Sequence, residues 1–273
     1  MHDLPSFDYD RDVPLDIRAA GSHAHDDVIE RLFSYTTPYG QRRVAEIIGP
    51  AGAGPHAAIL YIHWYEPESH DSNRTQFQRE ASRLAQRGVV SLLVETMWSD
   101  RDWFLKRTQA DDYANSVRQV VELRQAMDLL LAEPGVDLAR FAYVGHDFGA
   151  MYGVLMGQVD PRPTCYALMA GTPRFADWYL YYPKLEGAAR AAFVEEMSLL
   201  DPITNVAKLA PAPLLFQFGN DDPHVPIERG QSFFDAAAEP RQVRWYAAGH
   251  GLCEQATGER ISWLATQLGL SDT

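Results

Sequence analysis

The pattern of apolar residues predicts strands that alternate with helices from residue 57 to the C-terminus. Nearly continuous apolar runs of strand length occupy residues 57–64, 89–95, 141–145, 164–170, 214–218 and 243–247. Helical patterns occupy residues 73–86, 108–132, 148–156 and 228–237, and a last helix lies within 251–268. Apolar strands separated by helices are typical of a parallel sheet that helices cover on both faces. We therefore predict an α/β fold with a mostly parallel, doubly wound sheet.

Two segments depart from this alternation. Residues 1–28 mix Pro, Asp, Gly and His without a clear period, and we expect an irregular N-terminal arm there. A hairpin over residues 31–36 and 43–48 follows it. Residues 172–200 are too long for an ordinary crossover and hold several aromatic residues ahead of a helical stretch. We interpret them as a lid inserted over the C-terminal edge of the sheet, within a single domain that spans residues 29–273.

The composition is that of a water-soluble globular protein with an acidic excess. The 273 residues include 24 basic and 37 acidic side chains, for a formal net charge of −13, and 46% are hydrophobic. This balance argues against binding to nucleic acid or to anionic lipid, both of which need clustered Lys and Arg. No apolar run approaches the roughly 20 residues of a membrane span, and the acidic N-terminus lacks the apolar core of a secretory signal.

The cysteine pattern adds a further expectation about the compartment. Cys165 and Cys253 are the two cysteines, which is too few for a disulfide framework, and no paired spacing indicates zinc. We therefore expect a cytoplasmic protein that has no metal or cofactor and acts on a small-molecule substrate. Whether it forms a homo-oligomer is left open by the sequence.

One motif between a predicted strand and a predicted helix carries chemistry. Gly145-His146-Asp147-Phe148-Gly149 fits the G-x-nucleophile-x-G pattern of a nucleophile elbow. Glycines on either side let a strand and a helix approach closely around a strained central residue. The side chain at the centre then projects from the edge of the sheet, with the next backbone N–H close by. This arrangement makes Asp147 the candidate nucleophile.

With this motif the chain resembles the α/β-hydrolase superfamily from about residue 30 onwards. Residues 219–226 (GNDDPHVP) look like the acid loop of that family and select Asp222, while residues 248–251 (AGHG) look like its histidine loop and select His250. The context around these loops also resembles the dienelactone hydrolase branch. The resemblance places His63 and Trp64 in the oxyanion loop and implies the backbone N–H groups of Trp64 and Phe148 as the oxyanion donors.

The chain departs from esterases and peptidases at the nucleophile, where they carry Ser and it carries Asp147. A carboxylate is suited to displacement at a saturated carbon, which gives an alkyl-enzyme ester. In this respect the elbow resembles those of epoxide hydrolases and dehalogenases. We therefore expect Asp147 to open an epoxide and His250, oriented by Asp222, to activate the water that hydrolyses the ester.

The remaining candidates depend on which reaction takes place. In epoxide hydrolases, tyrosines of the lid protonate the leaving oxygen, and Tyr179, Tyr181 and Tyr182 are candidates that spacing does not separate. A dehalogenase needs indole N–H donors for halide, for which Trp64 and Trp178 are available, and His63 is a weaker candidate for contact with substrate. Two other readings stay open: an ester or lactone hydrolase with Asp147 as a base, and a binding protein without catalysis.

Overall fold

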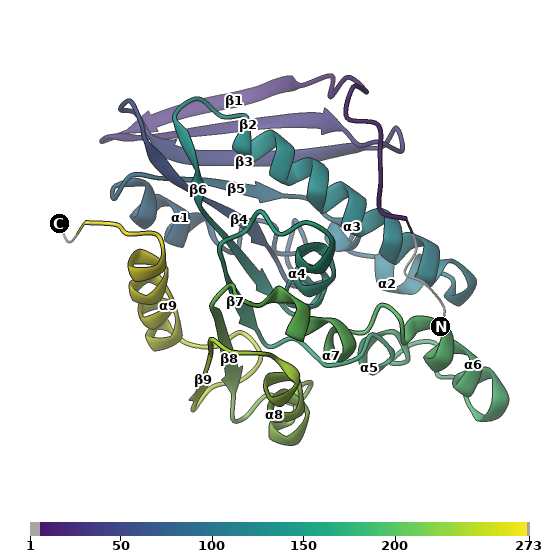
Figure 1. Cartoon of the computed structure of the whole chain (residues 1–273). Helices are drawn as coiled ribbons and strands as arrows, with labels where there is room; N and C mark the ends of the chain where they lie inside the picture. The colour runs from purple at the N-terminus through teal and green to yellow at the C-terminus, as the bar shows by residue number, and fades with distance from the viewer. Residues whose placement is uncertain (1–5, 272–273) are drawn as a thin grey trace.

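The computed structural model describes residues 6–271 and is built around one nine-stranded sheet (Figure 1). The strand order is β1-β2-β3-β5-β4-β6-β7-β8-β9. Strands β1, β2, β3 and β5 pair antiparallel, whereas all pairs from β5 across to β9 are parallel. The strands are β1 Arg18–His25, β2 Val28–Thr36, β3 Arg42–Pro50, β4 His56–Ile62, β5 Val89–Val94, β6 Val136–His146, β7 Cys165–Met169, β8 Leu214–Gly219 and β9 Arg241–Tyr246. The predicted, mostly parallel α/β sheet is confirmed.

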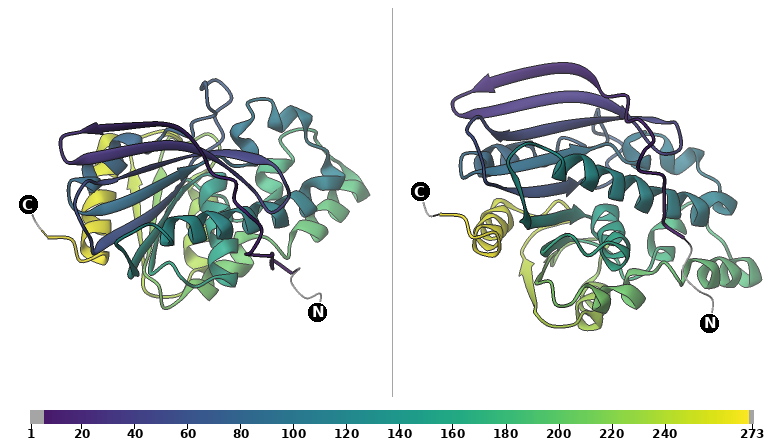
Figure 2. Two further views of the ribbon diagram at one scale, coloured as in Figure 1. Left: turned by 90° about the horizontal axis from the view of Figure 1, so that it is seen from above. Right: turned by 45° about the horizontal axis from the view of Figure 1, so that its top comes forward.

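Helices connect the strands and cover both faces of the sheet (Figures 1 and 2). They are α1 Gln78–Ala85, α2 Trp103–Lys106, α3 Gln109–Leu131, α4 Phe148–Val159, α5 Ala176–Tyr179, α6 Gly187–Met197, α7 Pro202–Asn205, α8 Ile227–Ala236 and α9 Glu254–Gln267, with short 3₁₀ helices η1 Met97–Ser99 and η2 Val206–Leu209. The long α3 begins and ends within one residue of its predicted bounds. The first predicted helix starts five residues later than expected, at Gln78.

Two hydrophobic cores lie on opposite faces of the sheet, and the central strands supply both. In β4, Ala58, Leu60 and Ile62 face the core under α3 and α4. Ile59 and Tyr61 face the core under α1 and α9. Because successive strand side chains point to opposite faces, a strand covered on both faces must be apolar at every position. This explains the continuous apolar runs in the sequence.

The N-terminal segment, expected to be irregular, contains the edge strand β1. It pairs antiparallel with β2, and Figure 2 shows it at the outside of the sheet. All eight of its residues are exposed. The expectation failed because an exposed strand has no buried face, so its sequence, RAAGSHAH, carries no alternation of apolar and polar residues.

The segment expected to form a lid holds the short helix α5 and the longer α6. Arg107, which follows α2, forms a buried ion pair with Asp112 of α3 and donates hydrogen bonds to the backbone carbonyls of Tyr179 and Tyr182. Trp178 of α5 packs its ring 5.8 Å from that of Phe148, at the start of α4. Arg107 therefore fastens the segment to the body of the domain, and α5 covers the turn between β6 and α4.

Candidate active site

The turn between β6 and α4 has the geometry of a nucleophile elbow. Asp147 stands at its centre with φ 56° and ψ −116°, a strained conformation for a residue with a side chain. A Cβ at Gly145 would lie 2.3 Å from the carbonyl oxygen of Gly149, and a Cβ at Gly149 would lie 2.2 Å from that of Ile62. Both flanking glycines are therefore required sterically.

The two carboxylate oxygens of Asp147 have different surroundings. Oδ2 accepts a hydrogen bond from the backbone N–H of Tyr65 at 3.5 Å, whereas Oδ1 is buried and has no hydrogen-bond partner within residues 6–271. The residue is 2% exposed. Burial raises the pKa of Asp147 to about 7, although the charge of His250 and the backbone N–H groups of Tyr65 and Phe148 act to lower it. Within the described residues, one oxygen of the carboxylate thus has a hydrogen-bond donor and the other has none.

The backbone N–H that contacts the Asp147 carboxylate from this loop belongs to Tyr65, one residue beyond the expected donor. The backbone N–H of Trp64 is engaged elsewhere, because it donates to Oε1 of Gln76 at 3.3 Å. The N–H of Tyr65 points to the Asp147 carboxylate instead. The predicted position of Trp64 as a donor is therefore wrong in this geometry, and the N–H groups at the Asp147 carboxylate are those of Tyr65 and Phe148.

His250 and Asp222 form the predicted histidine–acid pair. Nδ1 of His250 donates to Oδ2 of Asp222 at 2.8 Å, while Oδ1 of Asp222 accepts from the backbone N–H groups of His224 and Val225 at 2.8 and 3.1 Å. Burial lowers the pKa of His250, but the hydrogen bond to Asp222 and the negative charge of Asp147 raise it above its ordinary value overall. The pair leaves Nε2 of His250 as the imidazole atom available for proton transfer.

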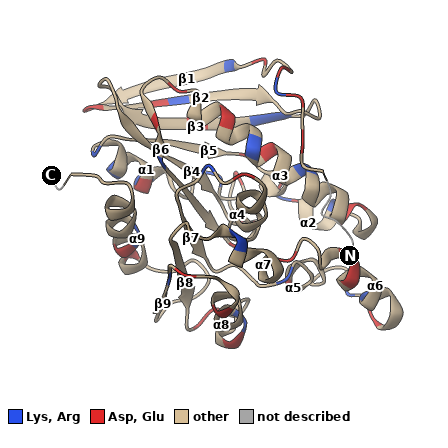
Figure 3. Cartoon of the chain, in the orientation of Figure 1, with Lys and Arg blue, Asp and Glu red and all other residues tan. Residues whose placement is uncertain are grey.

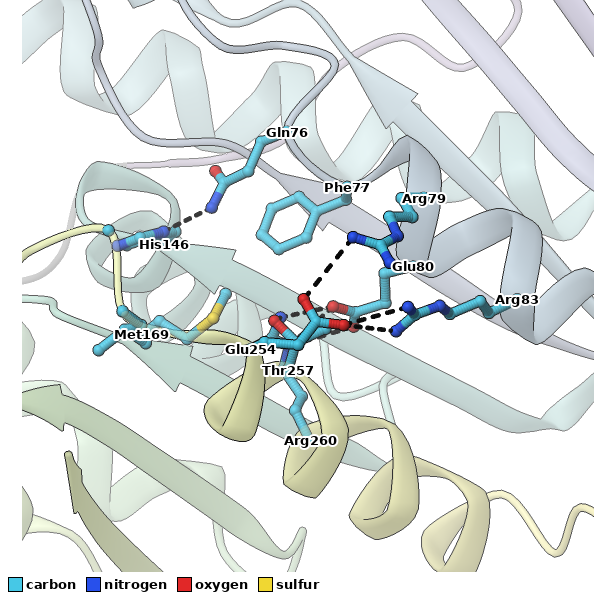
Figure 4. Close-up of a pocket in the computed structure, with 12 residues that line it drawn as sticks. Gln76, Phe77, Arg79, Glu80, Arg83, His146, Met169, Glu254, Thr257 and Arg260 are labelled. Carbon is cyan, nitrogen blue, oxygen red and sulfur yellow. Dashed lines mark hydrogen bonds and ion pairs between the residues drawn. The ribbon is translucent and has the colours of Figure 1, made fainter. Parts of the chain in front are cut away.

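A second histidine connects the elbow with the loop of His250. Nε2 of His146 donates to the backbone carbonyl of His250 at 2.9 Å, and its Nδ1 accepts from the side-chain amide of Gln76 at 2.6 Å, as Figure 4 shows for the latter pair. Burial and the charge of His250 hold the pKa of His146 well below its usual range, so its ring stays neutral. Through His146, Gln76 thus links the backbone of Trp64 to the loop that carries His250.

A cavity of about 330 Å³ opens beside His250. Its walls are formed by Trp64, Tyr65, Glu66, Pro67, Phe104, Trp178, Tyr181, His224 and His250. The ring of Trp64 stacks on that of His250 at 5.2 Å with an interplanar angle of 2°, and Trp178 meets His250 edge-on at 5.6 Å. The cavity is therefore mostly aromatic, with His250 in its wall.

Only one of the three candidate tyrosines lines this cavity. Tyr181 is 46% exposed, and its hydroxyl lies 3.4 Å from Nδ1 of His224. Tyr179 is fully buried in the core, where its hydroxyl bonds with that of Tyr152 at 2.6 Å. Tyr182 is exposed outside the cavity, with its carbonyl bound by Arg107. Tyr179 and Tyr182 are thus set aside as candidates, because neither phenol reaches the cavity.

His63 lies behind the oxyanion loop and does not line the cavity. Its Nδ1 contacts the carbonyl of Trp64 at 2.6 Å, and its Nε2 contacts the hydroxyls of Ser99 and Thr96 at 2.9 and 3.1 Å. Burial lowers the pKa of His63 to about 4. His63 therefore supports the loop as a neutral residue, and it is set aside as a candidate for contact with substrate because it does not line the cavity.

The structure also adds residues that the sequence motifs did not single out as part of the site. Tyr65, Glu66 and Phe104 line the cavity, and Gln76 supports the loops around it. Tyr65 and Glu66 directly follow the predicted oxyanion loop, and this position in the chain is the one feature of the sequence that points to them. Nothing in the sequence pattern marks Phe104 or Gln76, because their positions depend on how α2 and the segment before α1 fold back.

The described part of the chain also bears on metals, membranes and charge. Within residues 6–271, no group of three or more His, Cys, Asp or Glu side chains is placed to hold a metal ion. Over the same residues, no helix has the length and apolar character needed to cross a membrane. Acidic and basic residues are interspersed along α3 and α8 (Figure 3).

Comparisons with known proteins identify the fold. No protein-family model and no curated protein matched the sequence. Among solved structures, the chain is similar to an acetyl xylan esterase from Paenibacillus sp. R4 at 14% identity and a TM-score of 0.74, covering 93% of this chain and 89% of that one. It is also similar to acetyl xylan esterase 1 from Thermoanaerobacterium sp. JW/SL YS485 at 15% identity and a TM-score of 0.73, covering 96% and 90%. The chain therefore has the α/β-hydrolase fold.

Proposed function

We propose that the protein is a cofactor-independent hydrolase that opens an epoxide of a small organic substrate through a covalent ester on Asp147. The observation that carries this proposal is the state of the elbow carboxylate. Its Oδ1 has no hydrogen-bond partner among residues 6–271, its Oδ2 faces the Tyr65 amide, and its charge interacts with the His250–Asp222 pair. A carboxylate at this place is suited to attack on a strained saturated carbon.

In the first step Oδ1 of Asp147 attacks an epoxide carbon, and the bond from that carbon to the ring oxygen breaks. A C–O ester bond forms, and the leaving oxygen takes a proton from the hydroxyl of Tyr181. Tyr181 is suited to this role because it lines the cavity together with His250. The product of the step is a hydroxyalkyl ester of Asp147.

In the second step Nε2 of His250 accepts a proton from a water molecule, which adds to the ester carbon of Asp147. The negative charge that develops on Oδ2 is stabilised by the N–H groups of Tyr65 and Phe148, and losing one such donor typically slows a reaction by about 10²–10³-fold. The ester bond then breaks, His250 returns the proton to the departing alkoxide, and a diol leaves. Asp147 is released as the acid and gives its proton to solvent, and the Tyr181 phenolate takes a proton from solvent, which restores the starting state of the enzyme. Asp222 keeps the imidazole in the required tautomer.

Two observations favour alternatives. The indole N–H groups of Trp64 and Trp178 are buried and have no hydrogen-bond partner within residues 6–271, which suits halide release by the same covalent route. The pKa of Asp147 at about 7 suits a general base near neutral pH, as an ester or lactone hydrolase with a non-covalent mechanism needs. The esterases among the similar structures support hydrolysis in general.

The test is to trap the ester in His250→Gln and weigh the intact protein. Small terminal epoxides, the matching haloalkanes and p-nitrophenyl esters are offered in turn. We expect an adduct on Asp147 whose added mass equals that of the whole epoxide, because ring opening loses no atoms. A haloalkane adduct lacks the halogen and so identifies the dehalogenase alternative.

Two controls complete the trapping experiment. Asp147→Asn must give no adduct, and Asp221→Asn, a change at an exposed neighbour of the acid, must turn over like the wild type. If the wild type opens epoxides but His250→Gln collects no ester, covalent catalysis by Asp147 is wrong. Cleavage of p-nitrophenyl esters alone, without any adduct, would favour the general-base alternative.

A further inference from the structure

The cavity beside His250 has the composition of a cation-binding cage. Trp64, Tyr65, Phe104, Trp178 and Tyr181 contribute aromatic rings to its wall, and Glu66 contributes a carboxylate. We infer that the substrate carries a cationic ammonium group, which this cage holds next to Asp147. The inference rests on the proposed function for the reaction at this site, and it adds the chemical class of the substrate.

Four of the rings in the wall form two stacked pairs. Trp178 and Tyr181 stack with centroids 5.5 Å apart, and Tyr65 and Phe104 stack with centroids 5.8 Å apart. Aromatic faces carry negative electrostatic potential, so ammonium ions bind among several of them. A neutral apolar group gains contact area in such a cage, but it gains none of this electrostatic attraction.

The charges around the cavity favour a cation as well. No Lys or Arg of the described chain lines it, and Glu66 forms no ion pair within residues 6–271. Within residues 6–271, the Glu66 carboxylate accepts a single hydrogen bond, from the backbone N–H of Glu68 to Oε1 at 3.2 Å. The positive charge that His250 can carry is balanced by Asp222 at 2.8 Å, and the Asp147 carboxylate adds further negative charge.

Three arginines contact residues of the wall but do not line the cavity themselves. Arg101 donates to the carbonyl of Pro67 at 2.7 Å, and Arg229 donates to that of His224 at 3.0 Å. Arg107 places its guanidinium 4.6 Å from the centre of the Phe104 ring while paired with Asp112. The protein thus already holds one cation against an aromatic ring of this wall.

Binding of an unreactive isosteric pair tests the cage without any catalysis. Choline and 3,3-dimethylbutan-1-ol have nearly the same shape and differ in the charge of one central atom. We expect the wild-type protein to bind choline at least about tenfold more tightly, as measured by calorimetry or tryptophan fluorescence. Glu66→Gln should reduce this preference, whereas Glu68→Gln, an exposed change in the same turn, should leave it unchanged.

A reactive pair separates this inference from the proposed function. Glycidyl trimethylammonium and its carbon isostere, 2-(2,2-dimethylpropyl)oxirane, are offered to the wild type, and we expect a higher kcat/KM for the cation. Preferential binding of choline without opening of either epoxide supports the cage and refutes the epoxide reaction. Equal binding of choline and its isostere, with both epoxides opened equally, overturns the cage and leaves the reaction standing.

Discussion

Replacing the Asp147 carboxylate with the neutral amide of asparagine is expected to stabilise the folded protein. The side chain is 2% exposed, and burial raises its pKa from 3.8 to about 7. Holding the charged form in the folded state therefore costs about 4 kcal/mol, since each pH unit of difference corresponds to about 1.36 kcal/mol. Asp147→Asn removes this penalty while keeping nearly the same shape.

Because burial raises the pKa of Asp147, the stability of the wild-type protein should depend on pH. Between pH 3.8 and about 7 the unfolded chain releases the proton of Asp147 while the folded protein keeps it. The wild type should therefore lose stability as the pH rises through this window, by up to about 1.4 kcal/mol per pH unit. Above pH 7 the full penalty applies, and below pH 3.8 it is absent.

Urea denaturation of the wild type and Asp147→Asn at about pH 4 and about pH 8.5 measures this difference. We expect the variant to be more stable by up to about 4 kcal/mol at the higher pH and similar to the wild type at the lower one. Asp221→Asn, at an exposed neighbour of Asp222, is the control and should change little at either pH. Equal stability of the wild type and Asp147→Asn at about pH 8.5 would refute the claim that a buried, strained carboxylate stands at the elbow.

Three further changes probe other parts of the account. Tyr181→Phe should slow formation of the ester by about 10²-fold in a rapid-quench experiment, and a similar loss in Tyr182→Phe would contradict the choice of Tyr181. Gln76→Leu breaks the link between the loop of Trp64 and the loop of His250, so the ester should accumulate during turnover and be visible by mass; an unchanged steady-state level of ester would argue against that link. Arg107→Met leaves Asp112 without its buried partner and should lower the free energy of unfolding by about 3–5 kcal/mol, and a loss below 1 kcal/mol in urea denaturation would contradict this reading.

Much of the sheet could be predicted because its central strands are buried on both faces. β4, β5 and β8 are buried at every position, so their apolar runs stand out from the chain. β1 could not be predicted, because pairing with β2 leaves all of its side chains exposed. The late start of α1 has a local cause: Ser72 and Asn73 adopt positive φ angles of 46° and 67°, which no helical pattern reveals.

The part of the site that could be predicted is the part that lies in loops with recognisable sequence motifs. Asp147, Asp222 and His250 each follow a predicted strand, in the chain order of the family they resemble, and the structure brings the three side chains together. Their catalytic roles remain predictions. Whether the N–H of Tyr65 or that of Trp64 contacts Asp147 depends on how the loop after β4 turns. Which of the three tyrosines lines the cavity depends on the packing of α5. Both are set by tertiary contacts rather than by local sequence.

Single turnover in ¹⁸O-labelled water tests the central claim most directly. With protein in excess over the epoxide, the account predicts that label enters the Asp147 side chain, where the peptide that contains it can be found by mass spectrometry. The diol then receives its new oxygen from the protein, unlabelled on the first turnover. Label that appears in the diol at once, with none in Asp147, would contradict nucleophilic attack by this residue.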